Sequence, residues 1–121
     1  MTTLQEIEIV DVPKGQRSSL EWILEESFEG WYLWHSLKTL KDVEVVKVAK
    51  LSSKPVGLVM LKNLEKGVGY VYYIAVARAH RKRGIAKMLL DRSLQIFRDS
   101  GVSEVFASIE EDNQPSEKLF A

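Results

Sequence analysis

The chain has 121 residues, of which 45% are hydrophobic and 28% are charged, and it contains no cysteine. This length suits one domain over residues 1–121, and the composition excludes disordered, collagen-like and disulfide-stabilised proteins. Without cysteine, and with only two histidines, neither a thiol nucleophile nor a cysteine- or histidine-rich metal site can form, so we expect no metal. No apolar run reaches the roughly 20 residues that span a bilayer, and the first residues do not resemble a signal peptide. We therefore expect a cytoplasmic protein with no membrane partner.

The charges balance to zero overall but are unevenly distributed along the chain. Five basic residues and no acidic one lie within residues 78–87, which leaves a net charge of minus five on the rest. One concentrated positive site on a neutral protein is typical of a small-anion binder, whereas nucleic-acid binders usually have a broad basic face. We therefore expect an anionic small molecule as ligand and no nucleic-acid partner.

The first part of the chain predicts one strand followed by two helices. Residues 4–10 alternate in polarity as a strand does. Ser18 and Glu21 have the spacing of a capping box, which predicts a helix that begins after Ser18. Gly30 is expected to interrupt this helix, and a second helix is expected over residues 31–40.

The rest of the chain predicts four strands and two further helices. Runs rich in β-branched and aromatic residues predict strands at residues 43–50, 56–62, 68–76 and 102–109. The first two flank Ser52–Pro55 and predict a β-hairpin. Helical periodicity over residues 84–100 ends at Gly101, and Asn113 with Pro115 predicts the start of a last helix. The order β-α-α-β-β-β-α-β-α indicates a mixed α/β (α+β) fold.

The most informative segment runs from a predicted strand through a basic loop into a predicted helix. A helix N-terminus exposes up to four unpaired N–H groups and carries about half a positive charge. The small residues Gly84 and Ala86 would let an anion approach this backbone closely. Four basic side chains add positive charge nearby: Arg81, Lys82, Arg83 and Lys87. These features predict a pyrophosphate site at residues 81–87; a solvated basic surface, with Gly84 serving only the turn, is the alternative.

Residues 81–86, Arg-Lys-Arg-Gly-Ile-Ala, resemble the pattern Arg/Gln-x-x-Gly-x-Gly/Ala of the GNAT family of N-acetyltransferases. The preceding Tyr73–Val76 resembles that family's central strand, and Met88–Leu90 resembles its following helix. Asn113, with Ser116, Leu119 and Phe120, resembles the family's Asn-x-x-Ala-x-x-Leu-Tyr motif. The element order matches as well, so the resemblance covers essentially the whole chain. It implies a mixed, mostly antiparallel central sheet flanked by helices.

The resemblance also implies acetyl-coenzyme A (acetyl-CoA) as donor and an amine as acceptor. The cofactor pyrophosphate would lie on the basic loop and the helix start: Arg81, Lys82, Arg83, Gly84, Ile85, Ala86 and Lys87. In the family, the pantetheine arm pairs with the backbone of the central strand, which implies Ile74, Ala75 and Val76 here. Asn113 would supply a side-chain contact to the cofactor.

Direct acetyl transfer to an amine requires removal of a proton from the amine, a polarised thioester carbonyl and a proton for the departing thiolate. By resemblance, the Val76 N–H polarises the carbonyl, and Tyr70 occupies the position of the family's base. Tyr70 could instead be a strand residue that serves packing, and Glu110 could be a water-mediated base or a solvated acid in a turn. Phe120 stands where many members have the tyrosine that protonates the thiolate.

Five aromatic residues gather in the first two predicted helices, where this family builds its acceptor pocket: Trp22, Trp31, Tyr32, Trp34 and His35. Aromatic side chains at helical spacing usually belong to the core, so we expect most of them to be buried. Residues 31–35 and 80–86 are also similar to stretches of the protein N-terminal acetyltransferase branch, which favours a protein or peptide amine. A catalytically weak acyl-CoA sensor is the alternative function, because Phe120 has no proton to donate.

Compared with the family, the chain ends within the predicted last helix, and the usual two final strands have no counterpart. The fold is therefore expected to be truncated after this fourth helix. An uncovered edge at the fifth strand would invite pairing with another chain. Either the missing strands belong to a longer chain, or a partner chain supplies them, or the fold is a reduced one. We accordingly expect either a homodimer or a fragile fold.

Overall fold

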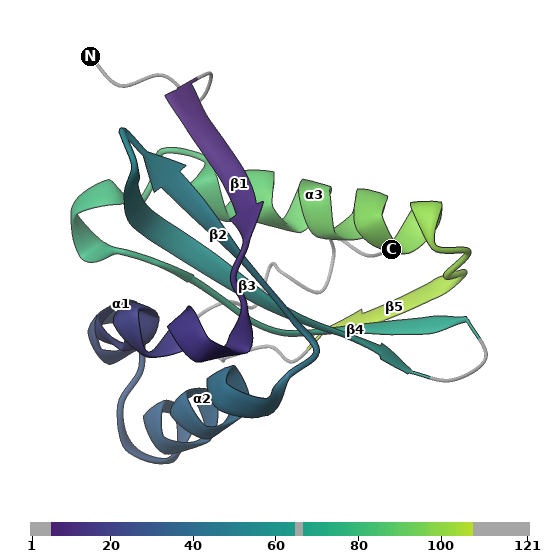
Figure 1. Cartoon of the computed structure of the whole chain (residues 1–121), viewed down its shortest axis with the longest axis horizontal. Coiled ribbons are helices and arrows are strands. Elements are labelled where there is room, and N and C mark those ends of the chain that lie inside the picture. The colour runs from purple at the N-terminus through teal and green to yellow at the C-terminus, as the bar shows by residue number, and fades with distance from the viewer. Residues whose placement is uncertain (1–5, 65–66, 108–121) are drawn as a thin grey trace.

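The computed structural model describes residues 6–64 and 67–107, which form a five-stranded sheet with helices on both faces (Figure 1). The strands lie side by side in sequence order: β1 (Ile7–Asp11), β2 (Val45–Leu51), β3 (Lys54–Leu64), β4 (Val68–Val76) and β5 (Glu104–Ala107). The first four strands are antiparallel, and β5 runs parallel to β4. The predicted mixed, mostly antiparallel sheet is confirmed.

Three α-helices cover the two faces of the sheet. Figure 1 shows α1 (Glu21–Ser27) and α2 (Gly30–Asp42) on one face and α3 (Ile85–Asp99) on the other. Two 3-10 segments, η2 (Lys14–Leu20) and η3 (Arg78–His80), precede α1 and α3. The predicted helix that begins at Asn113 lies outside the described residues. Within those residues, none of the helices has the length and apolarity of a membrane span.

The predicted capping box at Ser18 and Glu21 is wrong. Residues 14–20 already form η2, so α1 begins at Glu21 with Leu20 as its N-cap. The Ser18 carbonyl accepts the Glu21 N–H, and the Ser19 hydroxyl donates to the Gln16 carbonyl at 2.9 Å. Because Ser18 lies inside a helical turn, its backbone does not have the extended conformation that an N-cap requires.

The predicted hairpin is confirmed, and its strands continue further towards the turn than expected. Leu51 pairs with Lys54, which leaves Ser52 and Ser53 as the two turn residues. Both have positive φ angles, 51° and 70°, as a two-residue hairpin turn of the primed type requires. β2 and β3 are consequently long neighbours at the centre of the sheet.

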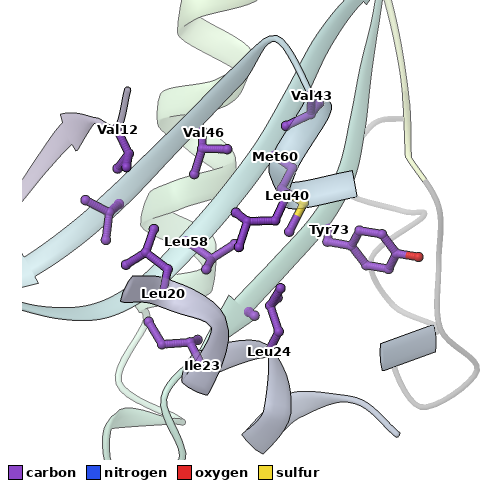
Figure 2. Close-up of a cluster of buried hydrophobic side chains, with 12 residues drawn as sticks. Val12, Leu20, Ile23, Leu24, Leu40, Val43, Val46, Leu58, Met60 and Tyr73 are labelled. Atoms are coloured by element: carbon purple, nitrogen blue, oxygen red, sulfur yellow. The ribbon is translucent and has the colours of Figure 1, made fainter. Parts of the chain in front are cut away.

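Hydrophobic cores lie on both sides of the sheet. The core under α1 and α2 is shown in Figure 2, and it includes Leu20, Ile23, Leu24, Leu40, Leu58 and Met60. The core under α3 includes Val59, Leu61, Ile85, Leu89 and Phe97. Ile23 on α1 and Leu89 on α3 are fully buried, so each of these helices turns an apolar side towards the sheet.

A β-bulge between β3 and β4 decides which tyrosines face which core. Met60 pairs with Tyr73 whereas Leu61 pairs with Val71, so Tyr72 is an extra residue in β4. As a result, Tyr72 and Tyr73 both pack against the core under α1 and α2, whereas Val71 belongs to the core under α3. The bulge thus brings two consecutive aromatic side chains to one face.

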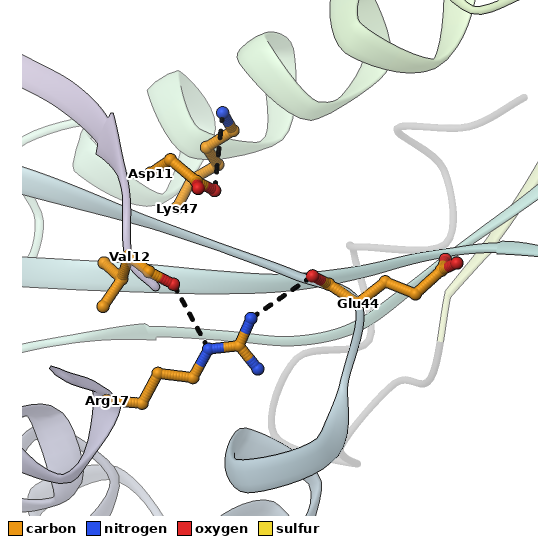
Figure 3. A network of polar contacts seen from close by, with 5 residues as sticks. All are labelled: Asp11, Val12, Arg17, Glu44 and Lys47. Atoms are coloured by element: carbon orange, nitrogen blue, oxygen red, sulfur yellow. Dashed lines mark hydrogen bonds and ion pairs between the residues drawn. The ribbon is translucent and has the colours of Figure 1, made fainter. Parts of the chain in front are cut away.

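Arg17 ties η2 to the segment between α2 and β2. Its side chain is buried, and its guanidinium donates to four backbone carbonyls: those of Val12 (3.3 Å), Leu40 (3.0 Å), Val43 (2.6 Å) and Glu44 (3.3 Å). Figure 3 shows two of these bonds beside the ion pair of Asp11 and Lys47. Burial lowers the pKa of Arg17, and the charge of Asp11 partly offsets this. This network holds η2, which leads into α1, against the end of α2 and the segment before β2.

The expectation that most aromatic side chains of the first two helices are buried is wrong. Four of them are substantially exposed: Trp22 (40%), Trp31 (60%), Tyr32 (45%) and Trp34 (57%). The inward stripe of α2 is instead formed by smaller residues at helical spacing: Leu33, Ser36, Leu37 and Leu40. Because these positions fill the side of α2 that faces the sheet, its tryptophans lie on the solvent side.

Candidate functional site

A cavity of about 730 Å³ lies where β4 ends, between the α1–α2 junction and the start of α3. Eight of the predicted cofactor residues line it: Ile74, Ala75, Val76, Arg81, Lys82, Gly84, Ile85 and Ala86. The remaining lining comes from Ser27, Phe28, Glu29, Tyr32 and His80. The predicted residues Arg83 and Lys87 are exposed and lie outside the lining, and the Lys87 Nζ is 3.2 Å from the Asp91 carboxylate.

The loop into α3 turns through two residues with left-handed backbones. Lys82 has φ of 63° and Gly84 has φ of 82°, a conformation that glycine adopts without the strain a side chain brings. Gly84 is the N-cap of α3, and no side chain caps the helix there. The first N–H groups of α3 therefore have no acceptor within the helix, as an anion site at this end requires.

Arg81 joins the two walls of the cavity. Its Nε donates to the Val76 carbonyl at 3.0 Å, and its Nη2 donates to the Glu26 carbonyl at 2.9 Å and to the Ser27 hydroxyl at 3.2 Å. The Arg78 N–H donates to the Glu26 carboxylate at 2.8 Å. These bonds satisfy the C-terminal end of α1, where positive charge is favourable. Arg81 is therefore held in place by hydrogen bonds to both walls.

The end of β4 directs backbone groups away from β3. The Ala77 N–H donates to the Val56 carbonyl at 2.8 Å, and bonding residues alternate along an antiparallel ladder. Ile74 and Val76 therefore turn their N–H groups towards the side of β5. In the described part of the chain, β5 pairs with β4 only as far as Val71. The N–H groups of Ile74 and Val76 thus lie beyond that pairing, at the cavity.

The structure does not bring Tyr70 into this cavity. Tyr70 lies near the other end of β4, opposite Lys62 and Phe106, and its half-buried ring is 4.7 Å from that of Tyr72. A second predicted catalytic residue, Glu110, and the predicted cofactor contact, Asn113, lie outside the described residues. The predicted site residues that line the described cavity are therefore those predicted to bind the cofactor.

A continuous row of aromatic rings, which we call the aromatic row, connects two residues of the cavity lining. Phe28 packs edge-on against Tyr73 at 5.3 Å, and the Tyr73 hydroxyl lies 2.6 Å from the His35 Nδ1. Trp31 stacks on His35 at 4.8 Å and meets Tyr32 edge-on at 5.3 Å. The sequence pattern indicated the aromatic residues of α2 but not their contacts with Phe28 and Tyr73, because the row is assembled across three elements.

A second, smaller cavity of about 330 Å³ lies behind the aromatic row, between α2 and the sheet. His35 and Tyr72 line it, together with charged side chains of both signs: Lys38, Asp42, Glu44 and Lys62. No cluster of three or more potential metal ligands occurs within residues 6–64 and 67–107.

The model of the acetyltransferase (GNAT) family matches residues 5–121. The chain belongs to the GNAT family. It is therefore an N-acetyltransferase of the class that uses acetyl-CoA. Among curated proteins, no sequence matches it significantly.

Solved structures show how closely this GNAT chain keeps the family fold. A ribosomal-protein-alanine N-acetyltransferase from Brucella melitensis superposes with a TM-score of 0.75 at 20% identity, over 95% of this chain and 90% of that chain. A ribosomal-protein-S18-alanine N-acetyltransferase from Escherichia coli gives 0.78 at 12% identity, over 94% and 74%. An aminoglycoside N-acetyltransferase in complex with CoA gives 0.67 at 18% identity, over 93% and 83%. At these identities the likeness shows the fold, which confirms the architecture that the sequence implied.

Proposed function

We propose that this GNAT chain binds acetyl-CoA in the 730 Å³ cavity and transfers the acetyl group directly to a primary amine of a protein or peptide. One observation carries the proposal: a single cavity joins the end of β4, which lies beyond its pairing with β5 in the described residues, to the uncapped start of α3. These are the two kinds of donor that a pantetheine arm and a pyrophosphate need. The CoA complex of a structural neighbour adds support.

Each part of the cavity has a role in the proposal. The N–H groups from Gly84 to Lys87, with the charges of Lys82 and Arg83, would hold the pyrophosphate. The backbone of Ile74, Ala75 and Val76 would pair with the pantetheine arm. Acetyl-CoA supplies the acetyl group as a thioester. The Val76 N–H would donate to the carbonyl oxygen on which negative charge develops during attack.

The proton of the attacking amine must leave before or during the transfer. Tyr70 and Glu110 are the proposed groups for this step, through water in the case of Glu110. Asn113 is proposed as a further contact to the cofactor. A protein amine is favoured because two structural neighbours are named as ribosomal-protein-alanine N-acetyltransferases. The proposed homodimer would show as twice the chain mass in light scattering.

Titration calorimetry with acetyl-CoA tests the placement of the donor. A glutamate at Gly84 puts a negative charge at the start of α3, and we expect Gly84→Glu to weaken binding by about 100-fold. The matched control is Gly101→Glu, because Gly101 also has a left-handed backbone, with φ of 81°, at the opposite end of α3 and in open space. The control should bind as the parent does. Equal affinities of Gly84→Glu and the parent would refute the site.

A catalytically weak acyl-CoA sensor is the second candidate, favoured by the position of Tyr70 outside the cavity lining. Release of the CoA thiol in the presence of a peptide with a free N-terminus distinguishes the two functions. An enzyme turns over, whereas a sensor binds acetyl-CoA without turnover. If Tyr70 accepts the proton, Tyr70→Phe should lower kcat by about 100-fold and leave the affinity for acetyl-CoA unchanged.

A further inference from the structure

The two walls of the 730 Å³ cavity come from segments of opposite charge. Residues 18–37 contain four glutamates and neither lysine nor arginine, whereas residues 78–87 contain five basic residues and no acid. The first segment supplies Glu29 and Tyr32 to the cavity, and the second supplies Arg81 and Lys82. The basic wall suits the anionic donor. Of the four glutamates on the opposite side, Glu29 is the one in the cavity lining, where its carboxylate favours a positively charged group.

Glu29 is available for such a contact. It lines the cavity and is exposed, and it has no ion-pair partner among the described residues. Glu26, by contrast, is already engaged, because its carboxylate accepts the Arg78 N–H. The wall thus keeps one carboxylate free beside the cavity while another is used to hold the walls together.

The exposed rings next to Glu29 suit a cation as well. Trp31 is 60% exposed and Tyr32 is 45% exposed, and each forms part of the aromatic row that reaches the cavity. Aromatic faces attract ammonium and guanidinium groups within about 6 Å of the ring centre. The same helix already holds one cation in this way, because the Lys38 Nζ lies 5.0 Å from the Trp34 ring centre.

We propose that the acceptor of this enzyme carries a second positive charge beside its reactive amine, and that Glu29, Trp31 and Tyr32 bind that charge. The inference rests on the proposed function and narrows its acceptor class. The shared chemistry is an amine with a neighbouring ammonium or guanidinium group, in a small diamine or in a peptide with a basic residue close to its N-terminus. The cation pairs with the Glu29 carboxylate and lies against the rings, opposite the basic wall.

Two matched pairs of acceptors test the inference by the rate of thiol release. The first pair is 1,5-diaminopentane and pentylamine, and the second is Ala-Lys-Ala and Ala-Gln-Ala. We expect kcat/KM of the charged member to exceed that of its neutral match by about tenfold, which corresponds to about 1.4 kcal/mol. Glu29→Gln should reduce this preference to about twofold. Glu8 is an exposed carboxylate on β1, and the control variant Glu8→Gln should retain the preference of about tenfold. The pair that shows the preference identifies the source of the cation.

A binding measurement gives a second readout that needs no turnover. All three tryptophans of the chain lie on α1 and α2, so their fluorescence reports on this wall. The charged acceptors should change it saturably in the presence of CoA, and Trp31→Ala should remove most of the change. Equal kcat/KM values for the two members of both acceptor pairs would overturn the inference. If no turnover occurs, the absence of a saturable change in tryptophan fluorescence would also overturn it.

The proposed function and the inference can fail separately. If the parent protein does not bind acetyl-CoA, the proposed function is refuted. If it binds acetyl-CoA but shows no preference for the charged acceptors, the inference alone is refuted. A dimer that dissociates when Trp31 and Trp34 are replaced by alanine would assign the exposed rings to a second copy of the chain. That result would also overturn the inference.

Discussion

The two faces of the sheet are held by different kinds of contact. Under α3 the packing is apolar and close: a Cβ added at Gly57 would lie 3.3 Å from side-chain atoms of both Ile85 and Leu89. Under α1 and α2 directional polar bonds contribute: those that Arg17 donates to four carbonyls and the one between the Tyr73 hydroxyl and His35. Close apolar packing resists displacement, which keeps the start of α3 in a fixed position against β4.

The face with polar bonds is also the one that presents aromatic rings to solvent. The core under α1 and α2 is as fully buried as the core under α3. On the outer side of α2, however, Trp31 and Trp34 are exposed. Exposed residues such as these can change without disturbing a core, so contacts to an acceptor could vary while the proposed donor site stays constant. The comparison teaches that the proposed donor site lies on the closely packed α3 face, whereas the proposed acceptor contacts lie on the exposed side of the other face.

Among the three substitutions that test this comparison, Arg17→Met should cause the largest loss of stability. The change leaves four carbonyls without their donor in a buried place, and we expect a loss of about 3–5 kcal/mol in the free energy of unfolding. Urea unfolding measures it. Arg92→Met, on the exposed side of α3, is the matched control and should lie within about 0.5 kcal/mol of the parent. A loss below 1 kcal/mol for Arg17→Met would mean that the polar network contributes little.

Gly69→Ala tests the close packing on the α3 face. The added Cβ would lie 2.7 Å from two ring atoms of the buried Phe97, so the ring or the strand must move. We expect a loss of about 1–3 kcal/mol in the same assay. Gly15→Ala is the control, since nothing lies within 4 Å of its added Cβ. Equal stabilities of the two variants would show that Phe97 or the strand can move to accommodate the added Cβ at little cost.

Tyr73→Phe should give the smallest of the three effects. It removes the 2.6 Å contact with the His35 Nδ1 but keeps the ring that packs on Phe28. We expect a loss of about 1 kcal/mol in the free energy of unfolding, together with a change in tryptophan fluorescence because Trp31 stacks on His35. Tyr32→Phe, on an exposed ring, should leave the stability unchanged. An unaltered emission spectrum of Tyr73→Phe would show that the contact does not orient the row.

Elements with strong local signals were predictable from the sequence. The hairpin at Ser52 and Ser53, the strand β4 and the helix that ends at Gly101 each follow from turn chemistry or periodicity within a few residues. The capping box at Ser18 failed because a preceding 3-10 segment competes for the same residues. Local patterns predict the end of an element well only when a neighbouring turn does not include the same residues.

The sequence by itself determined the residues of the proposed donor half of the site. The basic loop and Gly84 are contiguous, so their spacing alone brings charge and a close-approach backbone to the start of one helix. Only the tertiary structure decided the rest. The role of Arg81, the bulge at Tyr72 and the meeting of Glu29 with the basic wall depend on contacts between residues far apart in the chain. Helical periodicity indicates which side of a helix can be apolar, but strand register and packing select the side that is buried. This selection left the tryptophans of α1 and α2 exposed.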